Sequence, residues 1–181
     1  VIGASEPRGI CGSGLVDLTA ALLDLGAIDK SGRLLPPEET PPPLRRFVRP
    51  DGRGNGVFHL TDRVYLTAED VRSLQLAKAA VAGGIEVLLR QRELDAAALD
   101  GVYIAGGFGS CIDPDSAMAI GMLPQLPRSK LHCLGNTALA GASMAALSGE
   151  DRRRLGRIAA NCRYIELSGR QDFARAFTDH M

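Results

Sequence analysis

Three glycine-rich turns, each followed closely by a helical pattern, restrict most strongly what this chain can fold into. They are Gly9-Ile-Cys-Gly-Ser-Gly14, Gly106-Gly-Phe-Gly109 and Gly135-Asn-Thr-Ala138. The second and third follow short β-rich segments, at 99–105 and 131–134. Alternating strands and helices predict an α/β fold. In such a fold, ligands bind at the carboxyl ends of the strands, which is where these two turns lie.

The backbone of these turns is a candidate ligand site. Unpaired N–H groups at a helix N-terminus favour anions, and glycine lets a ligand approach the chain closely. The turns therefore indicate a phosphate or nucleotide site; the alternative is that glycine only makes tight turns between strand and helix. The P-loop, the dinucleotide fingerprint and the serine-hydrolase elbow are absent. No base accompanies Cys11 or Ser13, so no catalytic residue is predicted.

Apolar periodicity and capping residues predict the other elements. Helices are expected at 15–25, ended by Gly26; from Thr67 as N-cap to about residue 92; from Asp113, with Pro114 in the first position; at 137–147, with small residues suited to tight packing; at 151–161; and around Phe173 and Phe177. Strands are expected at 57–60, pairing with 63–66, and at 164–167.

Glycine and proline mark two further features. The Pro- and Gly-rich segment 29–56 is predicted as an excursion or linker outside the core. Gly83 and Gly84 interrupt the long helix, where each glycine costs about 1 kcal/mol relative to alanine. Close backbone packing is the expected compensation.

Charge and composition exclude several classes of function. Lys and Arg together number 21, as do Asp and Glu, so the net charge is zero and no basic nucleic-acid footprint is expected. No apolar run is long enough for a membrane span. The start has neither an initiator Met nor a secretory signal, which favours a piece of a longer, cytoplasmic protein. The cysteines have no metal-ligand spacing, so reduced, mostly buried thiols and no metal are expected: Cys11, Cys111, Cys133 and Cys162.

Five segments, taken in order, resemble one known family. They are 9–17 (GICGSGLVD), 74–81 (LQLAKAAV), 104–110 (IAGGFGS), 117–124 (AMAIGMLP) and 135–142 (GNTALAGA). Together they are similar to the C-terminal part of reductive activators of corrinoid proteins, the ATP-dependent iron–sulfur activases of corrinoid methyltransferase systems. The resemblance extends over nearly the whole chain, from about Gly9 to Phe177.

The resemblance implies a fold and a nucleotide site. The family's nucleotide domain belongs to the superfamily of acetate and sugar kinases, heat-shock chaperones and actin. A ribonuclease-H-like α/β lobe is therefore implied, of which residues 1–181 form an incomplete, C-terminal part. The implied cofactor-binding residues are Gly106, Gly107, Phe108 and Gly109 at the adenosine turn, Gln75 and Lys78 toward the adenine or ribose, Gly12 and Ser13 near the phosphates or bracing the cleft, and Gly135, Asn136 and Thr137 at an inter-lobe helix start.

The implied activity belongs to a longer protein. It is the ATP-dependent reduction of cob(II)alamin to cob(I)alamin, with a corrinoid protein or corrinoid methyltransferase as partner and a homodimeric assembly. The family's Asp-Gly-Thr-type phosphate loops, which position Mg²⁺, and its ferredoxin-type cysteine cluster do not occur in these residues. Both are expected N-terminal to Val1. This chain alone is therefore expected to bind ATP weakly and to hydrolyse it negligibly.

Two alternatives stay open at this point. One is another ATPase of the same fold, similar to 2-hydroxyacyl-CoA dehydratase activators or to kinases. The other is a non-catalytic interaction domain that keeps the fold without binding nucleotide. A cysteine-bearing ferredoxin domain upstream would favour the corrinoid activase over the other ATPases, and unchanged ATP affinity in a Gly107→Arg variant of the full-length protein would favour the interaction domain.

Overall fold

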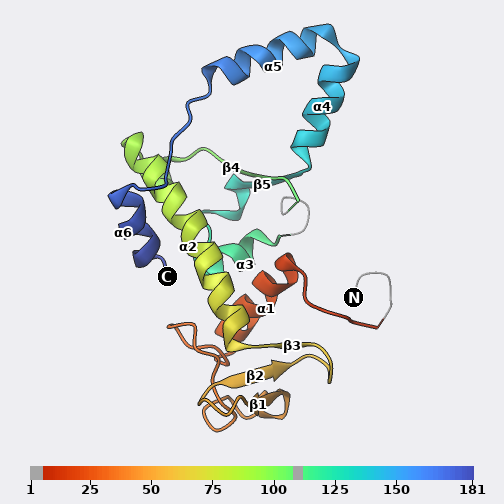
Figure 1. Ribbon diagram of the computed structural model, residues 1–181, viewed down its shortest axis with the longest axis vertical. Coiled ribbons are helices and arrows are strands. Elements are labelled where there is room, and N and C mark those ends of the chain that lie inside the picture. The colour runs from red at the N-terminus through yellow and green to blue at the C-terminus, as the bar shows by residue number, and fades with distance from the viewer. Residues whose placement is uncertain (1–5, 108–111) are drawn as a thin grey trace.

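The long helix α2 (Ala68–Gln91) runs through the middle of the molecule, with most other elements arranged around it (Figure 1). The structure is a computed structural model that describes residues 6–107 and 112–181. Thr67 caps α2 as predicted. Its hydroxyl accepts from the Asp70 N–H at 3.2 Å, and the Asp70 carboxylate accepts from the Thr67 N–H at 2.9 Å. This reciprocal pair fixes the start of α2.

Gly83 lies where α2 meets the last helix, α6 (Gln171–Asp179). A Cβ at Gly83 would stand 3.1 Å from the Phe177 backbone nitrogen, so a larger residue would push α6 outward. Glu86 of α2 and His180 at the end of α6 also meet, at 2.7 Å. The predicted aromatic pair of α6 is present, with the rings of Phe173 and Phe177 6.2 Å apart. Close packing at the glycine pair is thereby confirmed.

Helix α1 (Gly12–Asp24) packs between α2 and α3 (Pro114–Ala119). Its inner face joins an apolar cluster with the segments around α3: Val16, Ala20, Leu74, Ile112, Ala117 and Ile120. Gly26 follows the helix with a φ of +73°, a left-handed conformation that glycine adopts without strain. The predicted end of this helix is confirmed.

Three short strands form an antiparallel sheet in the order β1-β2-β3. They are β1 (Val48–Pro50), β2 (Gly56–His59) and β3 (Tyr65–Leu66), with a short 3₁₀ turn, η2 (Arg45–Phe47), before β1. Val48 pairs with Phe58, and Phe58 pairs with Leu66. The hairpin predicted from 57–60 and 63–66 is confirmed as β2 and β3, with shifted ends.

The prediction that residues 29–56 lie outside the core is wrong. Leu34 is fully buried and Val48 nearly so. Both belong to an apolar cluster with Leu22 of α1 and Leu66 of β3. Prolines restrict the backbone torsions of this segment, but they leave the apolar side chains between them able to reach the core.

The second sheet contains two parallel strands, β4 (Val102–Ala105) and β5 (Leu131–Gly135), connected through α3. Short 3₁₀ turns, η3 (Ala96–Ala98) and η5 (Arg128–Lys130), precede the two strands. Asp113 caps α3 as predicted, because its carboxylate accepts from the Asp115 N–H at 3.1 Å. The strands predicted at 99–105 and 131–134 are confirmed.

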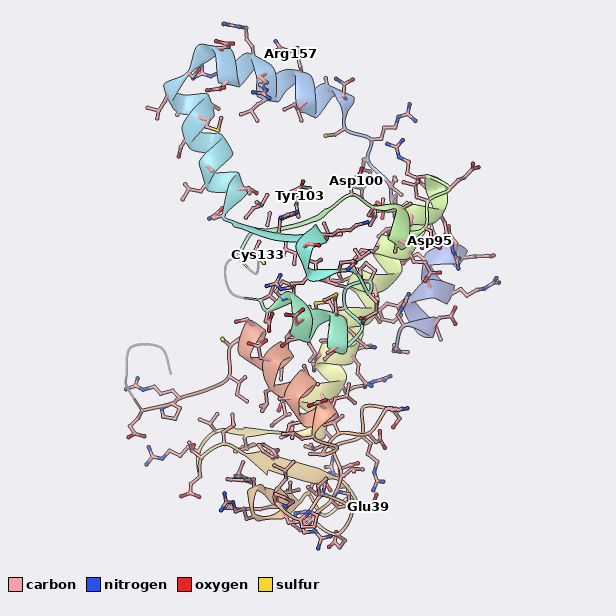
Figure 2. All side chains as sticks on the ribbon, turned by 180° about the vertical axis from the view of Figure 1, so that it is seen from behind. Glu39, Asp95, Asp100, Tyr103, Cys133 and Arg157 are labelled. Carbon is pink, nitrogen blue, oxygen red and sulfur yellow. The ribbon has the colours of Figure 1, made fainter. Side chains whose placement is uncertain are left out.

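Helices α4 (Thr137–Leu147) and α5 (Gly149–Asn161) follow β5 and together form what we call the arm. The arm lies at the opposite end of the molecule from β1–β3 (Figure 1). None of its residues is buried, and Figure 2 shows its side chains, Arg157 among them, standing away from the rest of the chain. Both helices were predicted. The tight packing predicted for 137–147 is wrong, because none of the α4 residues is buried.

Two smaller predictions also fail. Residues 164–167 form no strand, since no described strand lies beside them to pair with, and Tyr164 is 84% exposed. Cys11, Cys133 and Cys162 are exposed thiols rather than buried ones; Cys111 lies outside the described residues. Cys11 is exposed because it caps a helix. Within 6–107 and 112–181, no helix is long and apolar enough to cross a membrane.

Candidate functional site

Two of the three glycine turns lie side by side at the ends of the parallel strands. The Gly106 N–H donates to the Gly135 carbonyl at 2.8 Å. Both glycines have left-handed backbones, with φ of +93° and +68°. Because a side chain at either position would strain this conformation, glycine is required for the two turns to meet in this way. The pairing of β4 with β5 thus builds one backbone surface from two turns.

The described residues leave the glycine backbone of these turns uncovered. Within 6–107 and 112–181, and apart from the two chain neighbours, a Cβ placed on Gly106, Gly107 or Gly135 would find no heavy atom within 4 Å. A ligand can therefore lie directly against the backbone here. Beside it, the Asn136 side chain accepts from the Leu139 N–H at 3.0 Å and so caps α4. Phe108 and Gly109, also predicted to bind the cofactor, lie outside the described residues.

The first turn of α1 belongs to the same neighbourhood. Leu15 and Val16 pack with Ile104 and Ile112, which flank the second glycine turn on its two sides. The start of α1 and the residues on both sides of the second glycine turn thus share one apolar cluster.

Cys11 provides the cap of α1. Its sulfur accepts from the Gly14 N–H at 3.4 Å and lies 3.4 Å from the Ser13 hydroxyl. The contact with Ser13, followed by the Gly14 N–H, lowers the pKa of the Cys11 thiol, because both stabilise the thiolate. This sulfur occupies the helix N-terminus, so the N–H of Gly14 is already engaged.

Gln75 and Lys78 line a different place, a cavity between α1, α2 and residues 28–32 that includes no described residue of the glycine turns. The Gln75 amide donates to the Ser31 carbonyl at 2.9 Å. Burial lowers the pKa of the Lys78 ammonium. The predicted cofactor residues therefore divide into two groups, one at the turns and one at this cavity.

Sequence reasoning missed Thr19, which also lines the cavity. Its side chain is buried, and Oγ1 has no hydrogen-bond partner. A signal was present in the sequence: Thr19 follows Leu15 by four residues, which places a hydroxyl on the apolar face of α1.

The turns offer a ligand glycine backbone that it can approach closely, with the Asn136 side chain beside it at the start of α4. Such groups bind and orient a ligand, whereas proton transfer requires a titratable side chain. Among the described residues, no three His, Cys, Asp or Glu side chains gather into a group able to hold a metal ion. The described residues therefore gather no ligand set for an iron–sulfur cluster, whereas the glycine turns fit a ligand that lies on the backbone.

Comparisons with known proteins show the family of this chain. Residues 1–181 match the family model described as the C-terminal domain of RACo, the ASKHA domain. A corrinoid activation enzyme, RamQ, of Eubacterium limosum is 31% identical over 186 residues, which cover 98% of this chain and 31% of that protein. A solved structure of a reductive activator for corrinoid, iron–sulfur protein matches with a TM-score of 0.86 and 34% identity, over 98% of this chain and 29% of that one.

The chain thus spans a little under a third of the length of each of these relatives. Its α/β fold and its order of elements are those of the matched domain, and the match extends from the first residue to the last. The chain belongs to the family of RACo C-terminal ASKHA domains.

Proposed function

We propose that this chain is the C-terminal ASKHA part of a longer, ATP-dependent activator that reduces corrinoid proteins. The observation that carries the nucleotide role is the open backbone surface where Gly106 donates to Gly135. The corrinoid role is supported by the two relatives, whose names are those of corrinoid activators. These names favour this function over the other ATPases of the fold.

The turns supply the nucleotide's adenosine side with backbone contacts. Gly106 and Gly107 leave room for a base or ribose to lie against the chain, and Gly135 and Asn136 bound the same surface from the start of α4. Gly12 and Ser13 approach from the start of α1. We leave Gln75 and Lys78 out of this site, because the Gln75 amide is engaged by Ser31 and both line the separate cavity.

Mg²⁺ and an iron–sulfur cluster belong, in this proposal, to parts of the longer protein outside residues 1–181. The cluster supplies the single electron that converts cob(II)alamin to cob(I)alamin. ATP favours this transfer only by binding more tightly to one conformation of the protein than to another, at about 1.4 kcal/mol for each tenfold difference. Residues of this chain contribute one wall of the nucleotide site. The corrinoid protein as partner, and a homodimer, remain predictions.

The Gly107→Arg substitution in the longer protein tests the proposal. The new side chain would fill the space in which the ligand lies, so we expect ATP affinity to fall at least tenfold, measured by calorimetric titration. Gly156→Arg is the matched control, because Gly156 on α5 also has open space around it but lies in the arm. Equal ATP affinity in the wild type and both variants would favour the interaction-domain alternative.

The isolated 181-residue chain provides a second test. We expect it to bind ATP weakly, with no increase on adding Mg²⁺, because its described residues gather no metal-binding group. Tight, Mg²⁺-dependent binding by this chain alone would contradict the proposed division of the site between this chain and the rest of the protein.

A further inference from the structure

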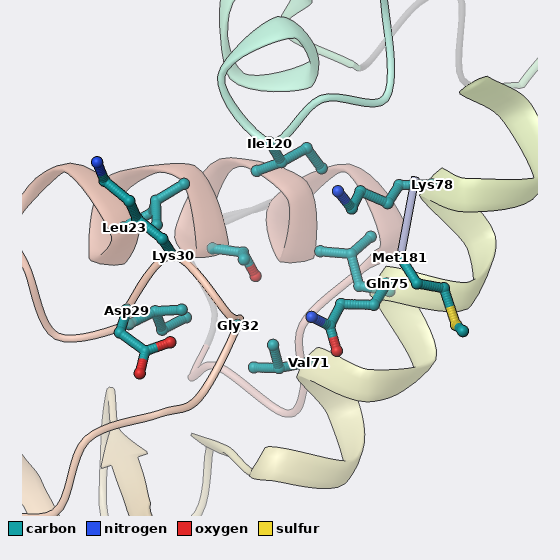
Figure 3. Close-up of a pocket in the computed structure, with 12 residues that line it drawn as sticks. Leu23, Asp29, Lys30, Gly32, Val71, Gln75, Lys78, Ile120 and Met181 are labelled. Carbon is teal, nitrogen blue, oxygen red and sulfur yellow. The ribbon is translucent and has the colours of Figure 1, made fainter. Parts of the chain in front are cut away.

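The cavity beside α2 has the walls of a small binding site. Its volume is about 90 Å³, and by this measure a single water needs roughly 10–15 Å³. Leu23, Ile28, Val71 and Ile120 make most of the wall apolar. Figure 3 shows the cavity between α1, α2 and the loop that contains Gly32, with Lys78 reaching in from α2.

Thr19 is the first polar group of this cavity. Other hydroxyls on helices of this chain donate to the carbonyl four residues earlier: Ser73 to Glu69, Ser143 to Leu139, and Thr178 to Ala174. Thr19 makes no such bond although its side chain is only 7% exposed. A buried hydroxyl without a hydrogen bond lowers stability, and so it points to a partner within the cavity.

Lys78 is the second polar group. It is partly buried, and no carboxylate of the described residues lies within ion-pair distance of its ammonium. The other charged groups on residues that line the cavity are the side chains of Asp29 and Lys30 and, in the 181-residue chain, the terminal carboxylate of Met181. Asp29 is already engaged by the Ser31 hydroxyl at 2.6 Å and the Arg33 N–H at 3.0 Å, and Figure 3 shows Lys30 directed away from the cavity. Among the described residues, no carboxylate, that of Met181 included, therefore forms an ion pair with the Lys78 ammonium.

The loop closes the cavity by a specific contact. Gln75 donates to the Ser31 carbonyl, and Gly32 has a φ of +82°. A Cβ on Gly32 would overlap the Gln75 side chain, so glycine is required for the loop to lie this close to α2. This hydrogen bond and the close approach at Gly32 hold the loop against α2 as one wall of the cavity.

We propose that this cavity is a binding site for a short aliphatic carboxylate, held by the Lys78 ammonium and the Thr19 hydroxyl. A carboxylate has two oxygens and needs few donors, which matches one ammonium and one hydroxyl. A phosphate, with more charge and more oxygens, would need several further donors in a cavity whose wall is mostly apolar. The apolar wall instead suits a chain of a few carbons.

Titration of the 181-residue chain with propionate, followed by methyl NMR, tests the proposal. We expect saturable shifts of the Thr19, Ile28 and Ile120 methyl signals. Lys78→Met and Thr19→Val should each weaken propionate binding about tenfold or more, because each removes a hydrogen bond to a charged group. Lys30→Met should change the affinity less than twofold, since its ammonium is directed away from the cavity.

The same set of variants contains a control for loss of folding. Thr19→Val removes an unsatisfied hydroxyl and should unfold at a higher urea concentration than the wild type, so its loss of affinity is not a loss of structure. Shifts that do not saturate, equal affinity in Lys78→Met, or stronger binding of inorganic phosphate than of propionate would each overturn the assignment. ATP binding at the turns is measured separately, so the failure of one proposal leaves the other intact.

Discussion

The region around α2 and the arm are built from similar helices but are stabilised differently. Helices α1 and α2 each bury several side chains, whereas α4 and α5 bury none. The arm is stabilised mostly by hydrogen bonds between its own residues. The Ser148 hydroxyl accepts from the Asp151 N–H, and the Arg152 guanidinium donates to the Ala145 carbonyl. Helical sequence signals are equally clear in both regions. Helix formation and contribution to the core are therefore separate properties of a sequence.

Two leucine substitutions should show the largest difference between the two regions in their effect on the free energy of unfolding. Leu22→Ala on α1 removes a side chain that is 2% exposed and should lower the free energy of unfolding by about 2–5 kcal/mol. Leu147→Ala on α4 removes one that is 90% exposed and should change it by less than about 0.5 kcal/mol. Urea unfolding followed by circular dichroism measures both. A large loss in Leu147→Ala would mean that the arm belongs to the cooperative core.

Glycines provide the next comparison. Gly83→Leu on α2 should separate α6 from α2 and lower stability by about 1–3 kcal/mol, because overpacking strains the contact. Gly141→Leu on α4, where a Cβ meets nothing within 4 Å, should raise it by up to about 0.8 kcal/mol through helix propensity. Thermal unfolding compares the pair. Equal effects would show that α6 is not tightly docked on α2.

Much of the fold was predictable because its signals are local. Thr67 and Asp113 mark helix starts, and Gly26 marks an end, through hydrogen bonds made within a few residues. The strand predicted at 164–167 failed for the opposite reason: a strand forms only beside a partner, which the local sequence does not reveal. The burial of Leu34 within a proline-rich segment likewise depends on contacts that are distant in sequence.

The candidate site was predictable to a similar extent. Glycine spacing located the turns, but the contact of Gly106 with Gly135 depends on the pairing of β4 with β5, which local sequence does not report. The separate position of Gln75 and Lys78 depends on how the loop at Ser31 folds over α2, and no short-range pattern reports this. Thr19 was missed because its distinguishing property, a buried hydroxyl without a hydrogen-bond partner, can be seen only in the folded structure.

Substitution of helix-capping residues should have a smaller effect on stability. Thr67→Ala removes the capping box of α2 and should lower global stability by about 1 kcal/mol. Ser148→Ala removes the matching cap of α5, where the loss should stay local. Hydrogen exchange distinguishes the outcomes: amides of the first turn of α5 should exchange faster in Ser148→Ala, with unchanged protection in α2. Slower folding or global loss in Ser148→Ala would contradict this.

The smallest expected effect is a change in stability at acidic pH. The Arg170 guanidinium, which bonds the Asp172 carboxylate at 2.6 Å, lowers the pKa of that carboxyl from 3.8 to about 2. Because the folded-state pKa is below the unfolded one, the ion pair stabilises the protein above pH 3.8, and this contribution is lost as the pH falls toward about 2. Asp172→Asn should therefore be slightly less stable than the wild type at pH 6, and the difference should vanish near pH 2. Urea unfolding across this range measures it.

Glu166→Gln, in the segment that links α5 to α6, is the comparison. The Tyr164 hydroxyl and the Ser168 N–H lower the pKa of the Glu166 carboxyl as well. Because Tyr164 is exposed, the loss of the Glu166 carboxylate should leave global stability unchanged. A deficit in Asp172→Asn that is constant from pH 6 to pH 2 would show that the side chain acts by shape and not by charge.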